Sequence, residues 1–430
     1  MLVSLLVMGC SSRDTVKQKA SVAQAQTRPL QQPTVTSPSA QTPVSAGYAA
    51  SRLDSQPWPP GMGQPLSQAS SRSAYPQKKS FFAPESALQG SNQQPQNGKV
   101  KVAILLPLTG KNSNLGQAML NAAQLAVFEM ANSNFELMPR DTGTTMENAV
   151  LAARDAIASE AQLLIGPLFA ADVAAIKPVV QTSSVNMLAL STDVSLAEPG
   201  TYIMGFAPAP QVERVIAYTS RKGAQHFAAL IPNGAYGQLV QQAFESAVRD
   251  QRGTVVIMEG VARIQEIITK RDQIDALLLP LGGNDLRQVV NQLTAGGVDP
   301  KKIRMLGTGL WDEAGLGKAL PLLVGGWYAT AEPDAREAFN KNFVKTYGQE
   351  PPRLATLSYD ATALAAVLAQ RGGHFDRVSL SNPSGFAGLD GIFRLTQDGL
   401  AERGLAVSEV TENGSKVVDP APSVFTSGRY

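Results

Sequence analysis

From residue 99 onward, short aliphatic runs alternate with longer amphipathic segments, and this alternation limits the possible folds more than any other feature of the sequence. Residues 100–106 form a β-branched and aliphatic run that ends at the turn residues Pro107–Gly110, a pattern typical of a buried strand. Apolar side chains then recur at helical spacing over 115–131, which predicts an amphipathic helix. Strands and helices in such alternation predict a parallel sheet that helices cover on both faces.

The alternation runs along the chain in two successive series. The first series predicts further strands at 135–141, 162–165 and 186–192, with helices at 145–159 and 171–182. The second predicts strands at 226–231, 254–259, 275–280, 303–307 and 325–330, with helices at 236–250, 262–271 and 284–296. Helices at 333–347 and 358–371 and a strand at 388–394 follow. Two such units predict an α/β protein with two Rossmann-like lobes, whose ligands bind beyond the strand ends in the crevice between the lobes.

Residues 11–98 have a different composition, with 15 Ser, 14 Gln and 11 Pro. Such a segment buries too little apolar area to offset the entropy of ordering its chain. We therefore expect a disordered tether with a root-mean-square span of roughly 50 Å. It precedes a folded body at 99–420 and a short C-terminal tail at 421–430.

The first ten residues, 1–10, end in the only cysteine of the chain, Cys10, which follows the apolar stretch Met1–Gly9. This arrangement resembles the lipobox of a bacterial lipoprotein signal, in which cleavage follows Gly9 and Cys10 becomes the lipid-modified N-terminus. No basic residue precedes the apolar stretch, as it does in most signal peptides, and Val7 stands where lipoboxes usually have Leu. The alternative is a free cysteine near a disordered end. The resemblance implies a periplasmic protein anchored by lipid, and Ser11 after the cysteine implies the outer membrane of a Gram-negative bacterium.

Charge and residue inventory exclude several classes of protein. The tail carries 8 basic and 3 acidic residues while the chain as a whole has a net charge of +2, so the body is nearly neutral and has no electrostatic footprint for nucleic acid. No apolar run is long enough for a membrane span. The chain has two histidines, His226 and His374, and no GxGxxG, GxxxxGKS/T, HExxH or GxSxG motif. Each of those motifs marks a known kind of catalytic or nucleotide site, so we expect no catalysis, no metal and no cofactor.

Several short motifs recur in an order that resembles the leucine-binding family of type I periplasmic binding proteins. They are the strand end Pro107–Gly110, Asp141-Thr142, the turn Gly166-Pro167, the helix starts Tyr236-Gly237 and Tyr359–Ala361, and the late stretch Gly391–Arg394. The resemblance covers about residues 99–420 and implies two lobes joined by three crossing strands that act as a hinge. It places the first lobe at 99–208 and 331–386, and the second at 209–330 and 387–419.

The resemblance also indicates which residues would line the cleft. Amino-acid-binding members present a Ser at the turn after the third strand, where this chain has the apolar residues Leu168–Ala170. A zwitterionic ligand needs donors for its carboxylate and an anion for its ammonium group. The remaining candidates are Ser191 and Thr192 for the carboxylate, Asp285 and Asp312 for the ammonium, and Tyr236 and Trp311 as cleft aromatics. Each has an ordinary alternative, as a turn residue, a helix cap or, for Trp311, part of the core.

A closer resemblance links the chain to the penicillin-binding-protein activators. The segments Arg140–Gly143 and Leu163–Phe169, the lipoprotein signal and the long polar tether all resemble this branch. In these outer-membrane lipoproteins the leucine-binding-like domain contacts a peptidoglycan synthase and carries no chemistry. The enteric activator also has an N-terminal helical-repeat domain, and this chain has the polar tail in its place.

These resemblances imply a non-catalytic, lipid-anchored periplasmic protein that regulates cell-wall synthesis by contact with a peptidoglycan synthase, a penicillin-binding protein. The alternative is a substrate-binding protein that delivers an amino acid or a related small solute to an ABC transporter or a sensor. We expect no nucleic-acid partner, and membrane contact through the N-terminal lipid alone.

Overall fold

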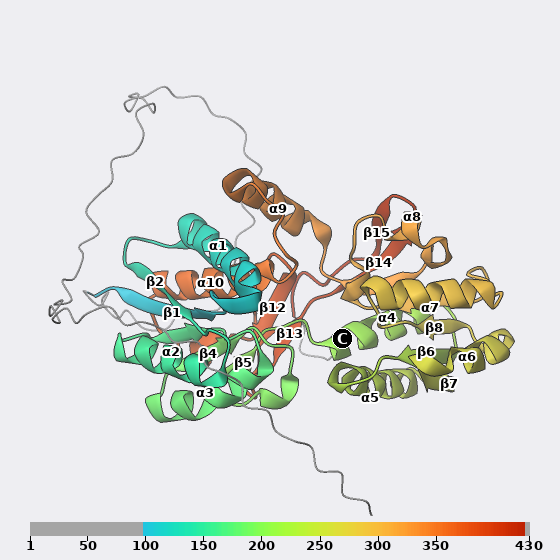
Figure 1. Cartoon of the computed structure of the whole chain (residues 1–430), viewed down its shortest axis with the longest axis horizontal. Coiled ribbons are helices and arrows are strands. Elements are labelled where there is room, and N and C mark those ends of the chain that lie inside the picture. Colours follow the sequence, from blue (N-terminus) through green and yellow to red (C-terminus); the bar gives the residue numbers. More distant parts are fainter. Residues whose placement is uncertain (1–97, 426–430) are drawn as a thin grey trace, which may run out of the picture. The chain divides into compact units, whose positions relative to one another are not determined.

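The computed structural model describes residues 98–425. Cys10, the predicted tether up to residue 97 and the last residues of the predicted C-terminal tail lie outside this range. The described residues form two α/β lobes, each with a sheet between layers of helices (Figure 1). The predicted fold class is therefore confirmed.

The first lobe is built on a sheet of parallel strands in the spatial order β2-β1-β3-β4-β5. Successive residues of a strand point to opposite faces of the sheet. Accordingly, Ile104 packs in a core with helices α1 and α10, whereas Leu105 packs in a second core with α2 and α3. The elements are β1 (Val100–Leu106), α1 (Ser113–Met130), β2 (Phe135–Asp141), α2 (Met146–Ala158), β3 (Leu163–Ile165), α3 (Ala170–Ser183), β4 (Asn186–Ala189), β5 (Thr201–Ile203) and α10 (Ala355–Gln370).

The second lobe is built on a mixed sheet in the order β15-β14-β10-β9-β8-β6-β7. Strands β6 to β10 are parallel, and β14 and β15 run antiparallel at one edge. Helices α4 and α5 cover one face and α6 and α7 the other. The elements are α4 (Pro208–Arg221), β6 (His226–Ile231), α5 (Ala235–Asp250), β7 (Thr254–Gly260), α6 (Ile264–Lys270), β8 (Ala276–Leu278), α7 (Gly283–Ala295), β9 (Arg304–Gly307), α8 (Leu316–Ala319), β10 (Trp327–Thr330), β14 (Ala406–Thr411) and β15 (Gly414–Asp419).

Within the described range the chain passes between the lobes three times. The crossings follow β5 at Phe206, follow β10 before helix α9 (Pro333–Tyr347), and precede β14 at Gly404. Helix α9 packs against α1 and α10 through Phe339 and Phe343. It therefore belongs to the first lobe, although it follows a strand of the second.

Residues 386–403 pack with the first lobe, which corrects the predicted boundary that placed 387–419 in the second. After the short helix α11 (Arg377–Leu380), strands β11 (Phe386–Gly388), β12 (Gly391–Leu395) and β13 (Ala401–Arg403) form a separate antiparallel sheet. Phe386, Phe393 and Leu395 are buried in the core that includes α1 and α10. The burial of these large apolar side chains favours the first lobe.

Helix α4, which starts at Pro208 and precedes strand β6, was not predicted from the sequence. Pro208 stands at the start of this helix. A proline is tolerated there because the first N–H groups of a helix have no partner within it. Pro208 and Pro210 therefore mark a helix start, although two closely spaced prolines usually indicate a turn.

Candidate functional site

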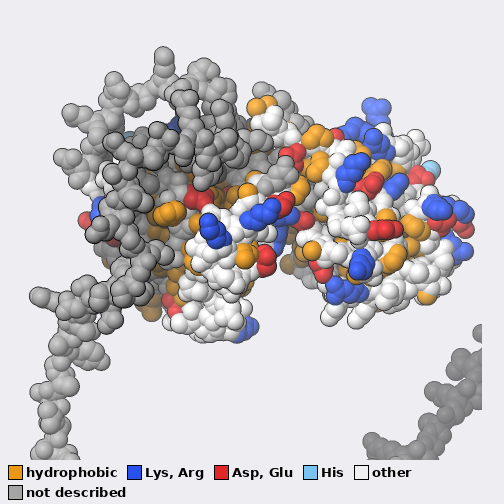
Figure 2. All heavy atoms as spheres, turned by 90° about the horizontal axis from the view of Figure 1, so that it is seen from above, with side chains coloured by type: hydrophobic (Ala, Val, Ile, Leu, Met, Phe, Trp, Pro, Cys, Tyr) orange, Lys and Arg blue, Asp and Glu red, His pale blue; other side chains and the backbone are white. Residues whose placement is uncertain are grey.

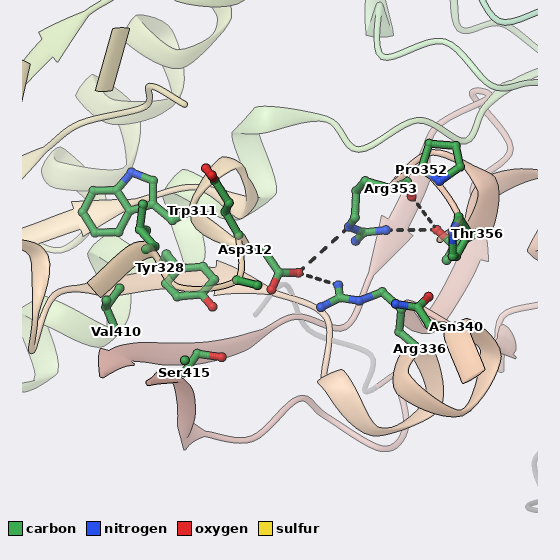
Figure 3. Close-up of a pocket in the computed structure, with 15 residues that line it drawn as sticks. Trp311, Asp312, Tyr328, Arg336, Asn340, Pro352, Arg353, Thr356, Val410 and Ser415 are labelled. Carbon is green, nitrogen blue, oxygen red and sulfur yellow. Dashed lines mark hydrogen bonds and ion pairs between the residues drawn. The ribbon is translucent and has the colours of Figure 1, made fainter. Parts of the chain in front are cut away.

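A pocket of about 350 Å³ lies where elements of the two lobes meet (Figure 3). Its volume is at the lower end of the range for small-molecule sites, roughly 300–1,000 Å³. The second lobe lines it with residues of the loop after β9 and of α8, β10, β14 and β15, and the first lobe with residues of α9, the loop before α10 and the start of α10. The labelled lining residues are Trp311, Asp312, Tyr328, Arg336, Asn340, Pro352, Arg353, Thr356, Val410 and Ser415.

The position of Asp312 is fixed by the residue before it. Strand β9 ends at Gly307, and a short 3₁₀ turn, Gly309–Trp311, follows. The Trp311 side chain is 1% exposed and lies over Gly307, where an added Cβ would come within 2.1 Å of the indole ring. With Trp311 held in the core, Asp312 points towards the arginines of the pocket (Figure 3), and Thr330 Oγ1 donates a hydrogen bond to its Oδ2 over 3.3 Å.

Two arginines of the first lobe face Asp312. Arg336, on α9, forms an ion pair with Asp312 Oδ2, and Arg353 Nε lies 4.0 Å from the same oxygen. The side chains of Asp312 and Arg336 are only 12% and 15% exposed. Buried charges are stable only when they are paired. The carboxylate of Asp312 and the two guanidinium groups beside it are therefore already paired in the structure, Arg353 also with Asp390.

Arg353 is held by further contacts within the first lobe. Its Nη2 lies 2.8 Å from Asp390 Oδ1, and its Nη1 donates to Thr356 Oγ1 over 2.9 Å. Its guanidinium carbon lies 4.1 Å from the centroid of the Phe206 ring, and Arg403 lies 5.1 Å from the same ring. Phe206 belongs to the first crossing between the lobes, so the pocket is connected directly to a lobe crossing.

Behind Arg353 lies a buried cluster of Asp360, Asp390 and Arg403. Arg403 Nη1 lies 3.8 Å from Asp360 Oδ2, and the Leu389 N–H donates to Asp360 Oδ1 over 2.8 Å. Burial, and then the neighbouring carboxylate of Asp390, raise the pKa of Asp360 to about 7, because both disfavour its charged form. The cluster therefore contains a carboxyl group that titrates near neutral pH.

Tyr328, on β10, contributes a hydroxyl group beside Ser415 (Figure 3). Burial, and then the negative charge of Asp312, raise the pKa of this hydroxyl to about 12. Both effects oppose formation of the phenolate. Tyr328 therefore remains a neutral phenol that can donate or accept a hydrogen bond at physiological pH.

Of the six cleft residues expected from the sequence, Trp311 and Asp312 line this pocket and the other four do not. Ser191 is buried, and its Oγ accepts the Asp193 N–H over 3.1 Å, as in a turn; Thr192, beside it, is exposed. The Tyr236 hydroxyl lies 3.3 Å from Thr308 Oγ1. Asp285 is exposed in the first turn of α7. Trp311 is a core side chain, the alternative given for it, because its ring is buried in the core of the second lobe.

Arg336, Arg353 and Tyr328 line the pocket but were not predicted from the sequence. Arg336 lies 24 positions after Asp312 and Arg353 another 17 positions on, and no local spacing marks either as its partner. The short Pro351-Pro352-Arg353 segment before a strongly apolar helix is the one signal that singles out Arg353. It indicates a rigid loop at a buried helix start, but it does not identify the partner.

The side chains of the pocket can bind a polar ligand, and their charges balance. Among residues 98–425, no three or more His, Cys, Asp or Glu side chains are grouped so that they could hold a metal ion. On the face shown in Figure 2, basic and acidic side chains are interspersed over both lobes. In the part of the chain that the structure describes, no helix is both long enough and apolar enough to cross a membrane.

Comparison with known proteins places most of the chain in one family. The family model described as "Periplasmic binding protein" matches residues 99–415. A curated relative, an uncharacterised protein of Rickettsia prowazekii, is 25% identical over 174 residues, or 40% of this chain and 46% of that protein. The match therefore spans less than half the length of that relative.

Solved structures share the fold at low identity. A protein assigned to a branched-chain amino acid ABC transporter of Rhodospirillum rubrum is 20% identical with a TM-score of 0.68, over 74% of this chain and all of that one. A leucine binding protein of Thermotoga maritima is 21% identical, with a TM-score of 0.56 over 76% of this chain and 99% of that one. An ABC transporter solute binding protein of Rhodopseudomonas palustris, in complex with benzoate, is 18% identical, with a TM-score of 0.55 over 76% and 98%.

Proposed function

The chain belongs to the periplasmic binding protein family, and we propose that it is a non-catalytic solute-binding protein that recognises an amino acid or a related zwitterion at Asp312. The observation that carries this proposal is the position of the Asp312 carboxylate beside two guanidinium groups in a single pocket. An amino acid carries an ammonium and a carboxylate group on the same carbon. It therefore needs an anion and strong hydrogen-bond donors side by side.

Binding would exchange internal ion pairs for equivalent pairs with the ligand. The ligand ammonium takes the place of a guanidinium at Asp312, and the ligand carboxylate pairs with the released Arg336 or Arg353. No buried charge is left without a partner, which is the condition for a buried ion pair to form at low cost. Tyr328 and Asn340 supply neutral hydrogen-bonding groups in the same pocket.

The solved relatives support a role in uptake. The Thermotoga maritima protein is named for leucine, and the Rhodospirillum rubrum protein for branched-chain amino acids. The Rhodopseudomonas palustris protein holds benzoate, a carboxylate without an ammonium group. We propose that the protein, once it has bound its ligand, delivers that ligand to an ABC transporter.

Thermal unfolding of the full chain tests this proposal, with L-leucine, L-isoleucine, benzoate and a muropeptide as separate additions. A ligand at about 100 times its Kd adds about 2.7 kcal/mol to the free energy of unfolding, which raises Tm by a few degrees. An amino acid that raises Tm supports the proposal. A panel that leaves Tm unchanged, or a response to benzoate alone, contradicts recognition of a zwitterion.

Two observations favour a second function, activation of a penicillin-binding protein. Asp312 is already paired within the chain, and the turn after β3 exposes the apolar Phe169, which is 37% exposed. In this case the outer surface would contact a peptidoglycan synthase, and the pocket would hold its internal ion pairs permanently.

A glycan-polymerisation assay distinguishes the two functions. The full chain is added to a purified peptidoglycan synthase, and the rate of polymer formation is measured. An activator raises this rate, and Asp312→Asn leaves the effect unchanged because the pocket is not used. A solute-binding protein has no effect on the rate.

The proposal also includes a lipid anchor at the N-terminus. We propose that Cys10 carries lipid and that residues 11–98 tether the body to the outer membrane. Labelled palmitate fed to cells that express the full chain should appear in the protein and be lost in Cys10→Ser. Incorporation that persists in Cys10→Ser would contradict this anchor.

A further inference from the structure

Asp312 is held between two guanidinium groups that belong to the other lobe. Asp312 follows β9 of the second lobe, Arg336 lies on α9, and Arg353 lies in the loop before α10. Because α9 and α10 pack in the core with α1, both arginines move with the first lobe. The ion pairs therefore bridge the lobes directly (Figure 3).

Both ends of this bridge are anchored within their own lobes. On the second lobe, Asp312 accepts a hydrogen bond from Thr330 and follows the buried Trp311. On the first lobe, Arg353 pairs with Asp390, whose side chain is 0% exposed. An ion pair between side chains that are already held in place loses little conformational entropy when it forms, so it can contribute more to holding the lobes together than a flexible surface pair.

The bridge also reaches a lobe crossing. Phe206 lies in the first crossing, with its ring 4.1 Å from the Arg353 guanidinium and 5.1 Å from that of Arg403. Arg403 lies just before the third crossing, and its Nη2 donates to the Met204 carbonyl over 2.9 Å. The arginine that reaches Asp312 is thus packed against the segment that must bend when the lobes move.

We propose that Asp312, Arg336 and Arg353 form a clasp that holds the two lobes in the arrangement of this structure. This clasp goes beyond the proposed function because it needs no ligand. Any cation that competes for Asp312, or the loss of its charge, releases the lobes. The same three residues then set how much of the binding energy of a ligand is used to rearrange the lobes.

Distances between spin labels on the two lobes test the clasp. The full chain carries Cys10→Ser, Arg154→Cys on the exposed side of α2 and Gln292→Cys on the exposed side of α7, and pulsed electron resonance is recorded without ligand. We expect a narrow distance distribution with Asp312 in place. Asp312→Asn should broaden or shift this distribution by several ångströms.

A matched control lies next to Asp312. Glu313 also lines the pocket, but it pairs with Arg287 of its own lobe over 2.8 Å. Glu313→Gln should therefore keep the distribution of the parent chain. The double variant Asp312→Asn/Arg336→Gln removes both charges together and so leaves no uncompensated charge on Arg336. If the single variant does not fold, the distance distribution of the double variant tests the clasp instead.

Two results would overturn the clasp. One is a distance distribution in Asp312→Asn and in the double variant that superimposes on that of the parent chain. The other is a Glu313→Gln distribution that shifts as much as that of Asp312→Asn. Neither result depends on whether the protein binds an amino acid, because no ligand is present.

Discussion

The guanidinium carbon of Arg353 lies 4.1 Å from the centroid of the Phe206 ring. Arg403 lies 5.1 Å from the same ring, so one aromatic side chain in a lobe crossing contacts two cations. A ring in such a position is attracted to the cations through its quadrupole as well as by packing. The stack links the pocket to the chain segment that connects the lobes.

Replacement of this ring by an aliphatic side chain should weaken the fold. Phe206→Leu keeps much of the apolar volume but removes both cation–π contacts, and we expect a loss of about 1–2 kcal/mol in the free energy of unfolding. Urea unfolding measures this loss. Phe169→Leu, at the exposed turn after β3, serves as the control and should change stability by less than about 0.5 kcal/mol. Equal losses in the two variants would show that the guanidinium stack contributes nothing.

The raised pKa of Asp360 predicts an unusual pH dependence of stability. The unfolded chain releases this proton near pH 4, whereas the folded chain keeps it until about pH 7. Between these values the folded state binds more protons, so the contribution of Asp360 to stability falls as pH rises through this window. Asp360→Asn has no proton to release, so its stability relative to the parent chain should increase from about pH 4 to about pH 7 and then level off.

Urea unfolding of both proteins across this pH window checks the prediction. Asp285→Asn, at an exposed position on α7, reports the general effect of removing one carboxyl group. If the stability difference between Asp360→Asn and the parent chain is the same at each pH, then Asp360 does not retain its proton in the folded state.

Gly307 is required because Trp311 lies over it. An added Cβ would come within 2.1 Å of the indole ring, so Gly307→Ala must displace the side chain that positions Asp312. Overpacking of this kind costs about 1–3 kcal/mol, which thermal or urea unfolding would detect. Gly260→Ala is the control, because a Cβ at Gly260 meets no atom within 4 Å. Similar losses at the two glycines would contradict the anchoring role of Trp311.

Many of the regular elements of this fold could be predicted because their periodicity is local, although strands β14 and β15 were not. The strand expected at 226–231 and the helix expected at 333–347 have the same bounds in the structure as β6 and α9. The position of Asp312 in the loop that follows strand β9 of the second lobe was also predictable, since parallel strands end at the edge where ligands bind. Helix α4 was not predicted because its prolines also fit a turn.

The partners of Asp312 could not be predicted, for a physical reason. Arg336 reaches it because α9 leaves the second lobe and packs on α1 and α10 of the first. Arg353 reaches it from a loop that Asp390 holds in place. These contacts depend on how distant elements pack, and no spacing in the sequence encodes them. The predicted assignment of 387–403 to the second lobe was wrong for the same reason. Phe393 and Leu395 are buried in the core of the first lobe, and this contact is not visible in the local sequence.

The measurement that tests recognition at Asp312 most directly is calorimetric titration of L-leucine and L-isoleucine into the full chain, Asp312→Asn and Asp285→Asn. A hydrogen bond to a charged group contributes about 1.5–3 kcal/mol, so Asp312→Asn should weaken binding by about 10- to 100-fold. Asp285→Asn should stay within about twofold, because its carboxylate is exposed on α7 and does not line the pocket. The predicted result is an amino acid whose binding weakens in Asp312→Asn but not in Asp285→Asn. Binding that is equal in Asp312→Asn, or the absence of any heat of binding in the parent chain, would contradict it.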